Sequence, residues 1–338
     1  MLLLSCLISL YENECYPKSL ALSIVQPIFK KKGSPNNPDN WRGVALIPTI
    51  AKIYTKILCS RLRSWSAEKN MICDNQAGFR AGYSTGDNVF VLKTLIDASL
   101  AKRKGRLYCC FVDFRKAFDS VCRSALWYKL GSLGVSGKFI KAVRQIYSLN
   151  KFAVKTSYDH MSEAIPSQSG VLQGCQLSPL LFILFINDLT EVLQISDQFV
   201  HALLFADDLV LISQTVNGLQ SLLDRLRLYC EMWNLELNRE KTKVMVFKKG
   251  SKLANAERWT YDQCALEVVK ELRFLGILFS GKGQWKKHIK AAVGKARTRS
   301  LQVMKLSYRC PYLPQSLMLR VFAAACLCLE CRHTLVFE

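Results

Sequence analysis

The sequence predicts an α+β fold, on three observations. Apolar residues recur at helical spacing in several stretches, among them residues 49–65 and 85–102. Continuous apolar runs that are rich in β-forming residues, such as residues 107–112, predict buried strands. Two further apolar runs are separated only by Asp207 and Asp208, a gap that predicts a hairpin of antiparallel strands. With 338 residues, of which 50% are hydrophobic, the chain can build a large core.

The N-terminal part predicts two strands and two helices. The strands are residues 24–29 and 41–46, separated by turn-forming residues 34–40. The segment 49–65 alternates apolar residues with Lys and Arg, so it predicts a basic amphipathic helix that is either solvated or turned toward phosphates. Residues 85–102 predict the second helix, which Gly105 ends.

The middle of the chain predicts helices on either side of a loop. Asp119 and Ser120 offer an N-cap for a helix over residues 121–130. A further helix is predicted over residues 139–149, and a loop over residues 170–174. Ser178 followed by proline predicts the start of a mostly buried helix that continues to residue 193.

The later part predicts mainly strands. The hairpin arms are residues 202–206 and 209–213, followed by a helix over residues 219–233 and a strand over residues 243–247. Residues 272–279 predict a strand pair, and Gly276 lies inside it.

The charge is strongly unbalanced. Forty-seven Lys and Arg against 26 Asp and Glu leave a formal net charge of +21, which predicts an anionic partner: nucleic acid first, an anionic membrane surface second. Residues 281–309 carry nine Lys or Arg and no acidic residue, which predicts a sub-domain boundary near Gly281. The apolar runs reach about ten residues, whereas a spanning helix needs about 20, so no membrane partner is expected. Residues 1–10 lack the basic start of a signal peptide and predict a buried helix.

The 14 cysteines are scattered, and most lie in apolar runs. This pattern predicts reduced core residues and an intracellular, reducing compartment. Nucleus and cytoplasm both stay open, because basic runs serve equally as import signals or phosphate contacts. Cys326, Cys328, Cys331 and His333 allow a zinc site, but they lack the paired spacing of structural zinc, so a truncated core helix is the preferred interpretation.

Three carboxylates carry the predicted chemistry. Asp207 and Asp208 occupy the tip of the apolar hairpin, and a plain turn is the alternative explanation for them. Asp113 ends another apolar strand, and it can converge with Asp207 on one edge if the strands share a sheet. Such a cluster calls for divalent cations. Two Mg²⁺ ions about 4 Å apart can activate a 3′-hydroxyl and neutralise a leaving pyrophosphate.

Five motifs in one order resemble those of the reverse transcriptases of non-LTR (LINE-type) retrotransposons. Residues 205–208, Phe-Ala-Asp-Asp, resemble the catalytic box, and residues 111–121 resemble the preceding aspartate box. Residues 170–179 resemble the template-gripping motif. Residues 237–243 and 274–277 resemble the next two motifs.

The resemblance extends upstream and implies a fold. Residues 28–32 with Trp41 and Arg42 resemble the fingers motif, and residues 76–80 resemble the next LINE motif. The match covers about residues 24–278 and implies a right-hand polymerase: fingers, a palm with an antiparallel sheet, and a partial thumb. The expected division is an incomplete approach segment (1–23), a reverse transcriptase domain with interleaved fingers and palm (24–280) and a basic, truncated thumb segment (281–338).

The resemblance also implies roles for single residues. Asp113, Asp207 and Asp208 are the expected catalytic residues and ligands of two Mg²⁺ ions, with Mn²⁺ able to substitute. The expected nucleotide-binding residues are Lys30 and Arg42 for the triphosphate, Phe118 under the sugar, Gln173, and Lys241 for the departing pyrophosphate. Taken alone, Phe118 is a core residue and Lys241 a solvated one. The expected template and primer contacts are Gly174, which is otherwise only a turn residue, and Lys286, Lys290 and Arg297.

Two positions depart from the family pattern. Gly43 stands where the fingers motif usually has proline, and it is expected to loosen a loop at the triphosphate site. Gln176 stands where proline is common. No endonuclease fits into the first 23 residues, so the chain is expected to begin at the approach to the fingers and to end inside a thumb.

The sequence therefore predicts an RNA-directed DNA polymerase that uses an RNA template, a DNA primer or target and dNTPs, with no obligate protein partner indicated. The first alternative is a catalytically silent, truncated retrotransposon remnant that only binds nucleic acid. The second is an RNA-dependent RNA polymerase, which the aromatic ring of Phe118 argues against. The third is an intron maturase, which would need an added RNA-binding domain.

Overall fold

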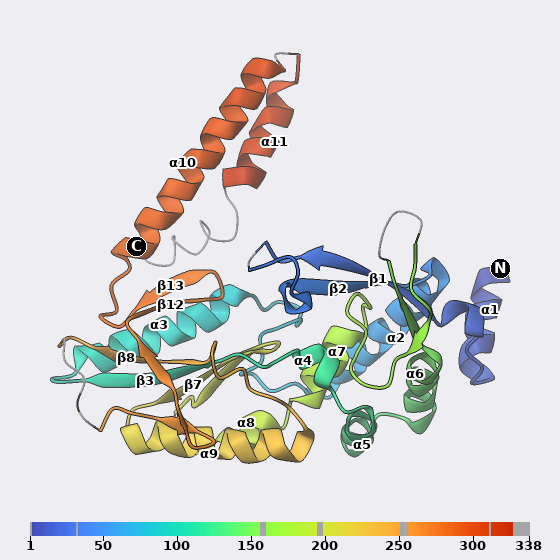
Figure 1. Cartoon of the computed structure of the whole chain (residues 1–338), viewed down its shortest axis with the longest axis horizontal. Coiled ribbons are helices and arrows are strands. Elements are labelled where there is room, and N and C mark those ends of the chain that lie inside the picture. Colours follow the sequence, from blue (N-terminus) through green and yellow to red (C-terminus); the bar gives the residue numbers. More distant parts are fainter. Residues whose placement is uncertain are drawn as a thin grey trace. The chain divides into compact units, whose positions relative to one another are not determined.

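The computed structural model describes residues 2–31, 33–155, 160–194, 199–250, 254, 256–310 and 312–326. Of the cysteine and histidine group at the C-terminal end, Cys328, Cys331 and His333 lie outside these residues. The chain divides into two compact units that are each discontinuous in sequence (Figure 1). The first unit comprises Met1–Phe79, Phe114–Leu193 and Leu226–Leu237. The second comprises Arg80–Asp113, Gln194–Arg225 and Asn238–Glu338.

A four-stranded sheet organises part of the first unit, in the order β2-β1-β4-β5. β1 (Leu22–Phe29) and β2 (Trp41–Leu46) pair antiparallel, which confirms the two strands predicted there. β4 (Lys151–Val154) lies parallel to β1 and antiparallel to β5 (Ile165–Pro166). A 3₁₀ turn, Pro38–Asn40, leads into β2.

Helices make up the rest of the first unit. α2 buries Leu58 and Leu62, as the helical spacing predicts, together with Tyr54. Ile50 and Ile57, which have the same spacing, are exposed, so the buried stripe is narrower than predicted. Ser136 caps α6 by accepting a hydrogen bond from the backbone N–H of Phe139. The bounds are α1 (Leu2–Glu12), a 3₁₀ turn (Lys18–Leu20), α2 (Thr49–Glu68), α4 (Ala117–Ser120), α5 (Arg123–Ser132), α6 (Gly137–Leu149), α7 (Ser178–Phe185) and α8 (Leu189–Leu193).

Two predicted helix caps are wrong. Asp119 and Ser120 do not cap a helix at residue 121; they lie inside the short α4, and α5 begins only at Arg123 without a side-chain cap. Ser178 begins α7 as predicted but does not cap it, because its hydroxyl lies 2.9 Å from the buried Tyr147 hydroxyl. The expected single helix to residue 193 also breaks after Phe185. The side chains of Ser178 and Asp119 make tertiary contacts instead, with Tyr147 and Gln173.

A five-stranded sheet organises the second unit, in the order β11-β8-β3-β7-β6. β3 lies at its centre between two antiparallel neighbours, so all but its first residue are buried, which explains its continuous apolar sequence. The bounds are β3 (Arg106–Val112), β6 (Ala202–Phe205), β7 (Asp208–Ser213), β8 (Lys243–Lys248) and β11 (Glu267–Val269).

The predicted hairpin of β6 and β7 is present, with its turn one residue earlier than expected. Ala206 and Asp207 form the connection, and Ala206 has a left-handed φ of 57°. Asp208 is already the first residue of β7 and pairs with Phe205. The two adjacent aspartates therefore differ in setting, one in the turn and one on the strand.

The remaining elements surround this sheet or follow it. α3 (Thr85–Ala101) packs on β3, β6 and β8 through Val89, Leu92 and Ile96, whose side chains belong to the core of the unit. α10 and α11 lie against each other, as Figure 1 shows in orange and red. The other bounds are α9 (Val216–Trp233), β9 (Thr260–Tyr261), β10 (Cys264–Ala265), β12 (Glu271–Phe274), β13 (Ile277–Ser280), α10 (Lys286–Arg309) and α11 (Gln315–Cys326).

The cysteines are less uniformly buried than the sequence predicts. Every cysteine from Cys6 to Cys310 is a free thiol. Cys59, Cys109, Cys110, Cys175 and Cys230 are buried, whereas Cys6, Cys15 and Cys264 are exposed. Within the described ranges, no helix combines the length and the apolar character needed to span a bilayer.

Candidate active site

The predicted convergence of Asp113 with the hairpin aspartates is present in the second unit. β3 and β7 pair in a register that places Val112 opposite Leu209. The next residues outward are Asp113 on one strand and Asp208 on the other, and Asp207 adjoins Asp208 in the turn. The three carboxylates therefore lie at one end of the paired strands.

Electrostatics show that the three carboxylates act on one another. The pKa of Asp208 is raised to about 6, first by burial and then by the negative charges of Asp207 and Asp113. Repulsion of this kind is unfavourable unless cations balance it. The arrangement is typical of a site that binds positively charged ligands.

The segment that follows α9 holds Asp113 in place. The backbone N–H of Asp113 donates to the Thr242 hydroxyl at 3.2 Å, and the N–H of Asn238 donates to the Asp113 carbonyl at 2.7 Å. Lys241 lies on the same segment, with its Nζ 3.6 Å from a carboxylate oxygen of Asp113. Lys241 thus lies beside Asp113. Thr242 is a buried supporting residue that the sequence analysis missed, although it lies within the quoted motif.

The carboxylates suit divalent cations in charge and donor type. Oxygen ligands are what Mg²⁺ prefers, and Mg²⁺ usually takes one or two carboxylates together with water and substrate phosphates. Among the described residues, no group of three or more His, Cys, Asp or Glu side chains is placed so that it could hold a metal ion by itself. The pKa of Asp208 is raised first by burial and only then by the charges of Asp207 and Asp113. A cation would offset that charge contribution, so the oxygen donors fit a metal that brings further ligands with its substrate.

Lys30 and Arg42 lie on the β1–β2 hairpin of the first unit. Arg42 is exposed and pairs with Ile28, two residues before Lys30. The Nζ of Lys30 donates to the Asp39 carbonyl at 2.7 Å. The expectation that Gly43 loosens a loop is wrong, because Gly43 lies inside β2 and pairs with Pro27.

Phe118 and Gln173 are brought together in the first unit. The ring of Phe118 is half-buried and stacks on Phe182, with 4.6 Å between the ring centroids. Gln173 donates from Nε2 to the carboxylate of Asp119 at 2.8 Å, and its carbonyl accepts from the N–H of Ala45 in β2. Asp119, expected to be a helix cap, therefore holds the Gln173 side chain. Desolvation raises the pKa of Asp119, although the hydrogen bond from Gln173 opposes this shift.

At Gly174 the loop lies too close to a neighbouring backbone to leave room for a side chain, which an ordinary turn does not require. Its φ is +113°, a conformation that side chains rarely adopt. A Cβ atom at this position would lie 2.5 Å from the carbonyl oxygen of Ala45. The loop therefore lies directly against β2.

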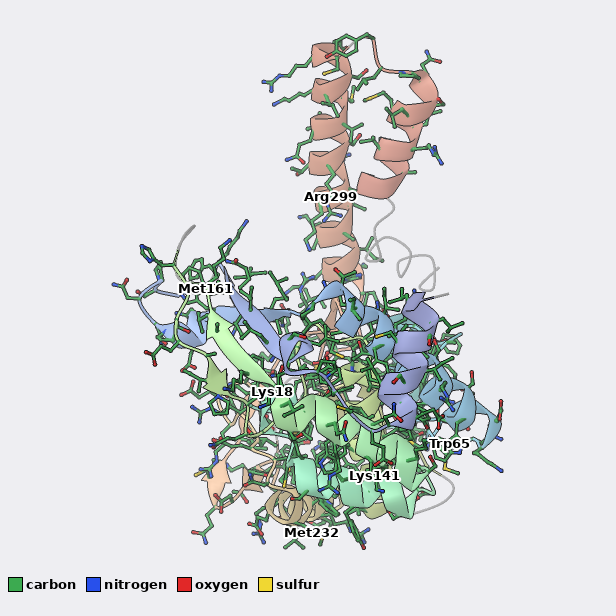
Figure 2. The ribbon with its side chains drawn as sticks, turned by 90° about the vertical axis from the view of Figure 1, so that its right-hand side faces the viewer. Lys18, Trp65, Lys141, Met161, Met232 and Arg299 are labelled. Carbon is green, nitrogen blue, oxygen red and sulfur yellow. The ribbon has the colours of Figure 1, made fainter. Side chains whose placement is uncertain are left out.

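The three basic residues predicted on the thumb segment share one surface of α10. Lys286, Lys290 and Arg297 line a hollow of about 420 Å³ together with Ile289, Val293 and Gly294. Figure 2 shows nitrogen-tipped side chains projecting from this helix, with Arg299 labelled part-way along it. The surface thus combines positive charge with exposed apolar groups.

Comparison with known proteins identifies the family. Residues 29–279 match the family model described as reverse transcriptase (RNA-dependent DNA polymerase). The chain belongs to the reverse transcriptase family. Reverse transcriptases generally use divalent metal ions, which agrees with the carboxylate cluster. The match also covers every predicted site residue except those on α10.

This chain matches curated proteins of transposons and other mobile elements. It is 26% identical over 308 residues to a probable RNA-directed DNA polymerase from transposon BS of Drosophila melanogaster, covering 87% of this chain and 33% of the relative. It is 24% identical over 295 residues to the RNA-directed DNA polymerase from mobile element jockey of Drosophila funebris, covering 84% of this chain and 31% of the relative. The chain thus spans about a third of the length of these relatives.

Solved structures confirm the predicted fold class. The reverse transcriptase chain resembles apo telomerase from Candida tropicalis, truncated from its C-terminal domain, with a TM-score of 0.56 and 13% identity. The likeness covers 82% of this chain and 57% of that one. Telomerase from Candida albicans gives a TM-score of 0.53 and 13% identity, covering 89% and 55%. The fold is the α+β right-hand polymerase fold.

Proposed function

We propose that this chain is the RNA-directed DNA polymerase portion of a LINE-type retrotransposon protein. The observation that carries the proposal is the position of Asp113 beside Asp208 at the end of paired strands, within a chain of the reverse transcriptase family. The reaction joins the primer 3′-oxygen to the α-phosphorus of a dNTP, and pyrophosphate leaves. Such phosphoryl transfer depends on positioning and charge neutralisation more than on a protein nucleophile.

Asp113, Asp207 and Asp208 would hold two Mg²⁺ ions, which Mn²⁺ can replace. When bound, the ions lower the pKa of the attacking hydroxyl and balance charge on the leaving group. The chain's own part is to orient the carboxylates: β3 and β7 fix two of them, and the contacts of Asp113 with Thr242 and Asn238 fix its backbone. Lys241 adds a positive charge beside Asp113 for the departing pyrophosphate.

Residues of the first unit would bind the nucleotide and the template. Lys30 offers a point charge, and Arg42 a planar fork, to the triphosphate. Phe118 would lie under the sugar, where its ring leaves no room for a 2′-hydroxyl. Gln173 and Gly174 would contact the template and the nascent base pair. The connection of Phe118, Asp119 and Gln173 through hydrogen bonds supports a common role.

The basic surface of α10 would follow the template–primer duplex. Lys286, Lys290 and Arg297 suit phosphates, and Ile289 and Val293 suit the sugar edges between them. Contacts of this kind recognise shape and backbone charge and need no base readout. They would supply affinity for the RNA template and the DNA primer or target.

Primer extension tests the proposal. The purified chain receives an RNA template, an annealed DNA primer and dNTPs, with Mg²⁺ and separately with Mn²⁺. Extension is expected, and Asp207→Ala/Asp208→Ala should abolish it. Asp97→Ala is the matched control, because it removes an exposed carboxylate on α3 that forms an ion pair with Lys93. Tight primer–template binding without any extension would instead establish the silent remnant.

A further inference from the structure

The loop that carries Gln173 is bound closely to the segment that carries Phe118. The N–H of Gly170 donates to the Val121 carbonyl at 2.9 Å, and the N–H of Val171 donates to the Phe118 carbonyl at 2.8 Å. At Gly170, φ is +75°, and a Cβ atom would lie 2.7 Å from the backbone of Asp119. The two segments therefore touch backbone to backbone.

One side chain holds this loop from inside. Arg123, at the start of α5, donates from Nε to the Gly170 carbonyl at 3.0 Å and from Nη2 to the Ser169 carbonyl at 3.0 Å. Its Nη1 donates to the Tyr147 carbonyl at 3.0 Å and to the Ser167 carbonyl. A further Nη2 hydrogen bond reaches the Ser167 hydroxyl. These five acceptors match in number the five N–H donors of a guanidinium. All five are carbonyl or hydroxyl oxygens, and none is a carboxylate.

The geometry requires arginine in particular. A planar fork with donors in fixed directions can reach three residues of one loop and the end of α6 at the same time. The guanidinium carbon also lies 5.1 Å from the centre of the Tyr147 ring, which packs against its plane. A lysine has only three donors, all on one nitrogen, so it cannot serve the five acceptors that Arg123 reaches.

We propose that Arg123 is a positioning residue that sets the spacing between Phe118 and Gln173 and thereby enforces selection of deoxynucleotides. This inference rests on the proposed polymerase function. Arg123 fixes the loop of residues 167–170, and the N–H of Val171 binds the carbonyl of Phe118, so the distance between the Phe118 ring and the loop stays constant. Without the guanidinium of Arg123, the loop moves away from Phe118, and the site then accepts a nucleotide that carries a 2′-hydroxyl.

The experiment compares the ratio of kcat/KM for dNTP to that for the matching rNTP. This ratio does not depend on the fraction of folded protein, so it separates positioning from a merely structural role. Arg123→Lys is expected to lower the ratio about tenfold, as a small displacement of a contact group does. Ser167→Ala removes one acceptor and is expected to lower it less. Addition of guanidinium at millimolar concentration to Arg123→Ala should restore part of the ratio.

Lys129→Met supplies the matched control. Lys129 is also a buried cation of α5, but it contacts the Phe185 carbonyl and Asp188, away from the loop. Its loss should lower stability and leave the ratio unchanged. Extension by the parent protein with an unchanged ratio in Arg123→Lys and Ser167→Ala would overturn this inference alone. Absence of extension by the parent protein would overturn the proposed function and this inference with it.

Discussion

Asp113 and Asp208 lie side by side at one end of two hydrogen-bonded strands, immediately beyond the pair of Val112 and Leu209. The strands bring these carboxylates together whether or not a cation is bound, because backbone pairing fixes their separation. The folded protein therefore contains a cluster of carboxylates that repel one another. This repulsion lowers the stability of the metal-free protein, and it predicts how that stability responds to substitution and to pH.

Asp208→Asn is expected to stabilise the metal-free protein at pH 8. The pKa of Asp208 is raised to about 6 in the folded state, so protonation of Asp208 favours folding. That contribution is complete below the ordinary pKa of 3.8 and is lost as pH rises through about 6. At pH 8 the ionised group costs about 1 kcal/mol, because solvent screens a partly exposed carboxylate. The variant should raise Tm by about 2–4 °C.

Thermal unfolding in a chelating buffer between pH 5 and pH 8 measures this effect. The gain of Asp208→Asn should be largest at pH 8 and should shrink as pH falls below 6. Asp97→Asn, on the exposed surface of α3, should show no such dependence. A gain that grew toward pH 5 would contradict the assigned direction of the pKa shift.

Phe118→Val is expected to increase the use of ribonucleotides by about tenfold or more. The smaller side chain leaves the space above Phe182 open, and a 2′-hydroxyl then fits where the ring lay. Single-nucleotide incorporation with dNTP and rNTP measures the change, with Phe90→Val, an exposed residue of α3, as control. Unchanged use of ribonucleotides in Phe118→Val would favour the RNA-dependent RNA polymerase.

The aspartate cluster was predictable because its signals are local or nearly so. A two-residue gap between apolar runs predicts the β6–β7 hairpin, and the apolar run before Asp113 predicts a central strand. Their pairing in one sheet was a hypothesis that the register of β3 and β7 confirms. Only the turn differed, by one residue, because the left-handed conformation falls on Ala206.

The contacts that hold the nucleotide-binding segments were not predictable in the same way. Arg123 finds its acceptors between 24 and 47 residues away in sequence, and no periodicity marks them. The local sequence predicts that Asp119 caps a helix, whereas its carboxylate binds Gln173, 54 residues later. The local sequence predicts a loosened loop at Gly43, whereas Gly43 pairs with Pro27 in a sheet. In each case tertiary contact overrides a local preference.

Gly174→Ala is expected to destabilise the protein by about 2–3 kcal/mol and to impair extension. Alanine is strained at the positive φ of this position. Its Cβ would also collide with the Ala45 carbonyl oxygen, which lies 2.5 Å away. Gly134→Ala is the matched control, because Gly134 also has a positive φ, +88°, but its Cβ would meet no atom within 4 Å. That variant should lose only about 1 kcal/mol. Equal losses in urea unfolding would show that the approach of the loop to β2 is not tight.

Replacement of Lys286, Lys290 and Arg297 by glutamine is expected to weaken binding of a template–primer duplex and to flatten its salt dependence. Each lost phosphate contact reduces the slope of log K against log salt by about 0.9, so three contacts reduce it by about 3. Extension at saturating duplex should stay near the parent rate, because the carboxylate cluster is untouched. Fluorescence anisotropy with a labelled duplex between 50 and 200 mM salt measures the slope.

The control for this variant replaces Lys102, Arg103 and Lys104, an exposed basic run that follows α3, by glutamine. It removes the same charge from the same unit, so it accounts for the loss of net charge alone. Its slope should change by much less than that of the α10 variant. Equal slopes in the two variants would mean that the hollow on α10 makes no specific contact with the duplex, and that overall charge of the chain accounts for its binding.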